Sequence, residues 1–81
     1  MHYRKGYGIT RIEIPHGSRV AGRALKELSL RQERLQVLAI EDHGDVHPIP
    51  ELSTVLKPLQ HVILYGRLDA VEKAFGVAGT P

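Results

Sequence analysis

The sequence predicts a small α+β domain: a small mixed β-sheet in β-α-β-β-β-α order, with helices on one face and a dimeric assembly. Four short segments have the alternating or continuous apolar pattern of strands, and two segments repeat apolar residues at helical spacing. The chain has 81 residues, and a domain of this size buries only about 60% of the surface of its unfolded chain. A second copy is therefore expected to complete the fold.

The first strand is predicted over residues 8–15, "GITRIEIP", where polar and apolar residues alternate. Ile12 and Ile14 share one face of this strand, and Pro15 ends it.

A helix is predicted next, within "HGSRVAGRALKEL" at residues 16–28. Ser18 is a suitable N-cap, whereas Gly22 weakens the helix and usually allows another backbone to come close. The apolar residues fall on one helical face at three- and four-residue spacing: Val20, Ala21, Ala24, Leu25 and Leu28.

The middle of the chain predicts a central strand and a hairpin. "LQVLAI" at residues 35–40 is apolar on both alternating faces, which is typical of a strand covered on both sides. "DHGD" supplies the residues of a tight turn, and "VHPIP" after it can form only a short or edge strand. The reason is that Pro48 and Pro50 lack a backbone donor. "ELSTVLKPL" is then expected to be a loop or a single turn.

The last strand and helix are predicted in "HVILYG" and "RLDAVEKAF". The strand is again apolar on both faces, so Tyr65 is expected in the core with its hydroxyl reaching water. In the helix, Leu68, Val71 and Phe75 form one stripe, and Gly76 ends it. Helices on one face cannot cover the other, so a partner subunit is the simplest cover.

Composition excludes several classes of protein. Cysteine is absent, which removes disulfides, thiolate zinc sites and a cysteine nucleophile. The net charge of +2 comes from interspersed charges, and the basic "HYRK" at residues 2–5 is interpreted as a solvated tail. No nucleic-acid partner is predicted, because exposed aromatic residues for stacking are lacking. No apolar run approaches the ~20 residues of a membrane span, so a cytoplasmic domain without direct membrane insertion is expected.

The polar turn at residues 41–47 raises the question of a metal site. His43 and His47 are four residues apart, but Gly44 and Pro48 argue against the helix on which this spacing would align two ligands. A solvated hairpin turn is the preferred interpretation, and no metal site is predicted. No enzyme is predicted either, because the serines lack the context of an activated nucleophile.

Polar residues beside the central strand are the candidates for ligand binding. Arg31 and Arg34 precede this strand, and a guanidinium at a sheet end can hold a phosphate in a two-pronged contact. Gln36 can donate and accept, which suits a nucleobase edge as well as a cross-strand hydrogen bond. For the two arginines, solvent-facing positions without a ligand are the alternative.

The order of four motifs resembles the C-terminal regulatory domain of potassium-conductance regulators, called RCK-C or TrkA-C. These motifs are "GSRVAGRALKELSLR", "VLAIED", "HPIP" and "VILYGRLDAVEKA", and the resemblance covers residues 9–75. One departure is Gln60-His61, where such domains usually carry Gly-Asp, and a looser turn is expected there. The connector before the central strand is also one residue shorter than in common members.

The resemblance implies a homodimer with a ligand such as cyclic di-AMP or another nucleotide at the interface. It assigns Arg31 to a phosphate, Gln36 to a base edge, and His47 and Pro48 to the groove wall. It also divides the chain into an N-terminal tail or linker (1–8), the regulatory domain (9–76) and a C-terminal tail (77–81).

The function implied by the resemblance is a cytosolic sensor that biases a potassium or other cation transport system. Its partners would be an upstream RCK-N domain or a membrane channel, transporter or antiporter subunit, at the cytoplasmic face of the membrane. The alternative is a dimerisation and assembly domain of a transporter complex that binds no ligand.

Overall fold

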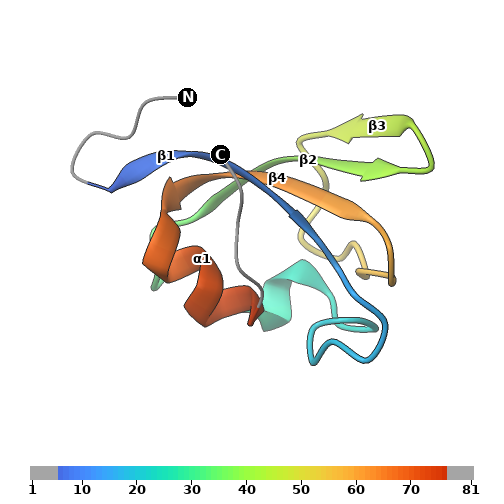
Figure 1. Cartoon of the computed structure of the whole chain (residues 1–81), viewed down its shortest axis with the longest axis horizontal. Coiled ribbons are helices and arrows are strands. Elements are labelled where there is room, and N and C mark those ends of the chain that lie inside the picture. Colours follow the sequence, from blue (N-terminus) through green and yellow to red (C-terminus); the bar gives the residue numbers. More distant parts are fainter. Residues whose placement is uncertain (1–5, 77–81) are drawn as a thin grey trace.

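The computed structural model of the chain describes residues 6–76, which form one antiparallel sheet with a helix packed on it (Figure 1). The elements are β1 (Tyr7–Glu13), the 3₁₀ turn η1 (Leu25–Glu27), β2 (Gln36–Asp42), β3 (Asp45–Pro48), β4 (His61–Arg67) and α1 (Leu68–Phe75). The predicted "HYRK" tail and the tail at residues 77–81 lie outside the described residues. No helix within residues 6–76 is long and apolar enough to cross a membrane.

The strands lie in the order β1-β4-β2-β3, and every pairing is antiparallel. The α+β class is confirmed, but the prediction of a mixed sheet is wrong. A parallel pair needs a long crossover connection, usually a helix. Here the α-helix follows the last strand, so it connects no two strands.

The helix predicted over residues 16–28 is wrong, because this segment pairs with another part of the chain. Gly22 has a φ of +86°, and the amides of Gly22 and Leu25 donate to the carbonyls of Leu56 and Thr54. Ser18 accepts from the amide of Val20 at 3.3 Å within a turn, and only η1 is helical. The apolar spacing therefore marks residues that reach the core from a looped segment.

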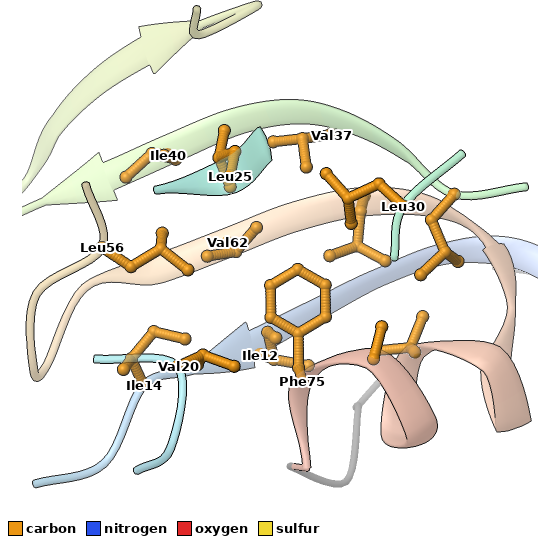
Figure 2. Close-up of a cluster of buried hydrophobic side chains, with 14 of the residues drawn as sticks. Ile12, Ile14, Val20, Leu25, Leu30, Val37, Ile40, Leu56, Val62 and Phe75 are labelled. Atoms are coloured by element: carbon orange, nitrogen blue, oxygen red, sulfur yellow. The ribbon is translucent and has the colours of Figure 1, made fainter. Parts of the chain in front are cut away.

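The hydrophobic core lies between the sheet and the layer formed by α1 and the looped segment (Figure 2). Its largest fully buried side chain is Phe75, whose ring stands in the middle of the cluster. The predicted strand and helix faces supply most of the remaining members: Ile12, Ile14, Val20, Leu25, Leu30, Leu35, Val37, Ile40, Leu56, Val62, Leu64, Ala70, Val71 and Ala74. The C-terminal helix is confirmed, and Gly76 ends it with a φ of +68°.

The other face of the sheet, which we call the open face, is only partly covered in the single chain. Ile9, Leu38 and Ile63 are half-buried there, and Tyr65 is 45% exposed. The expectation that Tyr65 belongs to the core is therefore wrong for the isolated subunit. The apolar pattern of β4 has two sources: Val62 and Leu64 lie in the core, whereas Ile63 and Tyr65 lie on the open face.

The hairpin and its edge strand are confirmed. His43 and Gly44 both have positive φ, at +50° and +87°, as a two-residue hairpin turn requires. β3 is short and occupies an outer position in the sheet.

The turn before β4 is held firmly, contrary to the looser turn expected from Gln60-His61. Gln60 is only 7% exposed, and its side-chain oxygen accepts from the amide of Lys57 at 2.8 Å. Its side-chain nitrogen donates to Asp42 at 3.2 Å. A buried glutamine therefore stabilises this turn and ties it to the end of β2.

A second turn, at residues 29–35, leads into β2 and places Arg31 on the surface. The amide of Leu35 donates to the carbonyl of Leu30 at 2.8 Å, and Arg34 has a φ of +57°. This turn packs closely against Gly66 of β4, where a Cβ would collide with the side chain of Leu35. The glycine thus allows the turn to lie directly on the sheet.

Candidate ligand groove

A groove of about 410 Å³ lies beside the first half of β2. β3 pairs with β2 only from Ala39 onward, so at Gln36 and Val37 the side of β2 that faces away from β4 has no neighbouring strand among the described elements. The looped segment at residues 16–28, the turn at residues 29–35 and the chain after β3 form the remaining walls. The lining residues are Leu25, Lys26, Leu28, Leu30, Arg31, Gln32, Leu35, Gln36, Val37, Pro50 and Leu52.

The charges in this groove are all positive. Lys26 and Arg31 line it, and none of the lining residues carries a carboxylate. Three other hollows on the described surface each contain at least one acidic residue: Glu27 and Glu33, Glu33 and Asp69, or Asp42. The groove is therefore the hollow best suited to an anion. Its volume is within the range of small-molecule sites, roughly 300–1,000 Å³.

Gln36 lies at the boundary between the groove and the open face. It is the first residue of β2, and its side-chain nitrogen donates to the carbonyl of Val37 at 3.2 Å. An amide group has two donor hydrogens and an acceptor oxygen, so this bond leaves further capacity for a ligand. Gln36 also pairs directly with Tyr65 of β4.

The four candidate residues do not form one site in the single chain. Arg31 and Gln36 share the groove, whereas His47 lines a separate hollow of about 280 Å³ together with Asp42, Thr54, Lys57 and Gln60. Pro48 is exposed on β3 opposite Ala39. Pro50 lines both hollows and separates them.

Sequence reasoning missed Lys26 and Leu52 as groove residues. Lys26 lies within the helix predicted over residues 16–28, and Leu52 lies in the segment predicted as a loop or a single turn. The missing signal was long-range pairing: the amide of Lys26 donates to the carbonyl of Leu52 at 2.9 Å. Local apolar spacing contains no information about such a contact.

The polar turn that suggested a metal site contains a short contact between His43 and Asp42. Nδ1 of His43 lies 2.6 Å from Oδ1 of Asp42, and the His43 side chain is 87% exposed. Within residues 6–76, no three histidine or acidic side chains lie close enough together to hold a metal ion.

A row of charges crosses one end of the open face. Arg11 and Glu41 are 2.7 Å apart, and His61 lies 3.7 Å from Glu13 and 4.0 Å from Glu41. The hydrogen bond from Arg11 keeps the pKa of Glu41 below its usual value of 4.5. Hydrogen bonds from Gln60 and then His43 likewise lower the pKa of Asp42 from 3.8.

These pKa shifts predict acid sensitivity. In the unfolded chain, Glu41 and Asp42 bind protons at a higher pH than they do in the native chain. Their contribution to stability is therefore fully present when the pH is above the usual carboxyl pKa, and it is lost as the pH decreases below that value. Thermal melts should show a constant midpoint from pH 7 to about pH 5 and a decrease between about pH 5 and pH 3. Asp42→Asn should lower the midpoint at pH 7 and reduce this decrease. A variant whose midpoint falls as steeply as that of the unmodified chain would contradict the assignment of Asp42.

Comparison with known proteins gives matches in both sequence and fold. A curated protein of Rhodopirellula baltica, a probable alpha-L-glutamate ligase, is 30% identical over 67 residues, which are 83% of this chain and 16% of that protein. The chain thus spans a small part of this relative's length, and the match says nothing of a ligase activity here.

Two solved structures share the fold. The RCK_C domain dimer of S. agalactiae BusR in complex with c-di-AMP superposes with a TM-score of 0.69 at 23% identity, over 82% of this chain and 92% of that chain. The GsuK channel bound to NAD gives a TM-score of 0.66 at 28% identity, over 89% of this chain and 13% of that chain. The likeness to BusR shows the fold alone.

The sequence profile of the TrkA-C domain family, in turn, matches residues 9–78. This match covers most of the chain and agrees with the four ordered motifs and with the antiparallel fold. The chain therefore belongs to the TrkA-C domain family.

Proposed function

We propose that this chain is a dimeric, non-catalytic sensor domain that binds a nucleotide ligand such as cyclic di-AMP and thereby regulates cation transport. The observation that carries the proposal is the groove beside β2, which is lined by Lys26, Arg31 and Gln36 and by no carboxylate. The two cations suit phosphates, and the amide suits the edge of a base.

The relatives support this ligand class. The BusR domain dimer was solved with c-di-AMP, and the GsuK channel with NAD. Both ligands combine phosphates with adenine, which is the chemistry that Arg31 and Gln36 can recognise together. Cyclic di-AMP also has two identical halves, so a two-fold dimer would offer it two equivalent grooves.

The dimer contact is proposed at β3 and the chain that follows it. Four large apolar side chains between residues 46 and 55 are exposed, and Leu52 among them lines the groove: Val46, Ile49, Leu52 and Val55. We call these four residues the apolar stretch. A contiguous exposed apolar surface marks an interaction site, and we propose that the apolar stretch forms one. A second copy that covers the apolar stretch would also close the groove.

Ile49 adds a conformational argument. It is 79% exposed and has a φ of +46°, which is unfavourable for a β-branched residue. Such strain persists where the surroundings or the function compensate for it. In the proposed dimer the Ile49 side chain is buried by the partner. His47 and Pro48 precede it on β3, from where they can reach the groove of the second copy.

Regulation would follow from a difference in affinity. A ligand that prefers one dimer geometry shifts the equilibrium between the two geometries, and with it the state of the attached transport machinery. The size of this shift is limited by the difference between the ligand's affinities for the two geometries. The proposed partners are an RCK-N domain or a membrane transporter subunit at the cytoplasmic face of the membrane.

Calorimetry with cyclic di-AMP tests the proposal. Arg31→Ala should weaken binding by about 10- to 100-fold, because a hydrogen bond to a charged group contributes about 1.5–3 kcal/mol. Arg34→Ala is the matched control: Arg34 lies three residues further along the same turn but lines a different hollow, so binding should be unchanged. A dimer that gives no heat with cyclic di-AMP, NAD or ATP would favour the ligand-free assembly role instead.

A further inference from the structure

We infer that Tyr65 is the stacking surface for the base of the ligand, so that the groove selects compounds with an aromatic base over other phosphorylated compounds. This inference rests on the proposed function. It adds a residue on the open face to the site, beyond the groove residues themselves.

The position of Tyr65 follows from the register of the sheet. Tyr65 pairs with Ile9 of β1 on one side and with Gln36 of β2 on the other. Residues directly opposite each other in an antiparallel pair project from the same face, with Cβ atoms about 4.5–5.5 Å apart. The phenol ring is therefore a neighbour of Gln36, which also lines the groove, and Tyr65 is 45% exposed.

The ring of Tyr65 is supported by its neighbours. Its centroid lies 6.3 Å from that of Tyr7, with an interplanar angle of 29°. The guanidinium of Arg67 lies 5.9 Å from the centroid of Tyr7, and Asp69 holds this guanidinium by two hydrogen bonds of 3.0 and 3.1 Å. The four side chains form an ordered stack that ends in a partly exposed aromatic ring.

The stack and the groove together define a ligand with three parts. Arg31 and Lys26 take phosphate, Gln36 takes the polar edge of a base, and Tyr65 takes its flat face. Stacking on an aromatic side chain tolerates different bases because every base has a π-face. The contact with Tyr65 therefore favours any ligand that contains a base, whereas the hydrogen bonds of Gln36 favour one base over another.

Calorimetry on two variants tests the inference, with cyclic di-AMP and inorganic pyrophosphate as probes. Tyr65→Leu should weaken cyclic di-AMP binding by about 10- to 100-fold, the usual effect of losing one stacking contact. Tyr65→Phe, which keeps the ring, should stay within about 2-fold. Pyrophosphate has no base, so its affinity should be the same in all three proteins.

A second measurement reports on the ring itself. On addition of cyclic di-AMP, the ring protons of Tyr65 should shift upfield in the NMR spectrum, and pyrophosphate should leave them in place. The inference is overturned if Tyr65→Leu binds cyclic di-AMP as tightly as the unmodified chain does. It is also overturned if this substitution weakens the binding of pyrophosphate as much as it weakens the binding of cyclic di-AMP. If the unmodified chain binds cyclic di-AMP and Arg31→Ala weakens it while Tyr65→Leu does not, the inference fails and the proposed function stands. Absence of nucleotide binding by the unmodified chain overturns both.

Discussion

Phe75→Ala is expected to lower the free energy of unfolding by about 3–5 kcal/mol, the largest stability change predicted for this chain. Phe75 is fully buried and stands in the centre of the core, at the last residue of α1 (Figure 2). Its removal takes away the apolar area that the ring buries and leaves a cavity that the strands around it cannot fill. Small domains have a total stability of only about 5–15 kcal/mol, so much of it would be lost.

Urea denaturation followed by circular dichroism measures this loss. Phe75→Leu keeps most of the apolar volume and should cost clearly less than Phe75→Ala. Glu72→Ala changes an exposed position on the same helix and should stay within about 0.5 kcal/mol. If Phe75→Ala lowered the free energy of unfolding as little as Glu72→Ala does, Phe75 would not anchor the helix to the core.

Ile49→Asn is expected to abolish the proposed dimer without destabilising the subunit. Burying one isoleucine side chain contributes about 1.5–3 kcal/mol, and a two-fold interface buries it twice. The dissociation constant should therefore rise by at least about 100-fold, since each 1.4 kcal/mol is a factor of ten. Asparagine accepts a positive φ more readily than a β-branched residue does, so the thermal midpoint of the monomer should stay the same or increase.

Leu59→Asn provides a matched control. Leu59 also follows a proline, has a φ of +71° and is 48% exposed, but it lies outside the apolar stretch. Its replacement should relieve the backbone in the same way and leave the dimer intact. Analytical ultracentrifugation over a concentration series distinguishes the two variants. A dimer that persists in Ile49→Asn would rule out the apolar stretch as its contact.

The elements that could be predicted from the sequence are those whose pattern reflects local geometry. Alternation correctly predicted that Ile12 of β1 and Ile14 just after it are buried, and the turn residues at His43-Gly44 marked the hairpin. The stripe ending at Phe75 identified α1. In each case, the residues that decide the structure lie within a few positions of one another.

The errors came from contacts between distant segments. Residues 16–28 have helical spacing, but the amides of Gly22, Leu25 and Lys26 donate to carbonyls at residues 52–56. The same pairing brings Lys26 next to Leu52 in the groove wall. Spacing indicates which side chains are buried; it does not indicate which backbone will be the hydrogen-bonding partner.

The sequence by itself determined the α+β class, the four strands, the C-terminal helix and the family, and it named Arg31 and Gln36. Only the tertiary structure decided that these two residues share a groove, that His47 faces a different hollow, and that Tyr65 lies on an uncovered face. Strand and helix patterns depend on the direction of neighbouring side chains along one segment. A binding site depends on which segments meet, and that is set by the packing of the whole chain around its core.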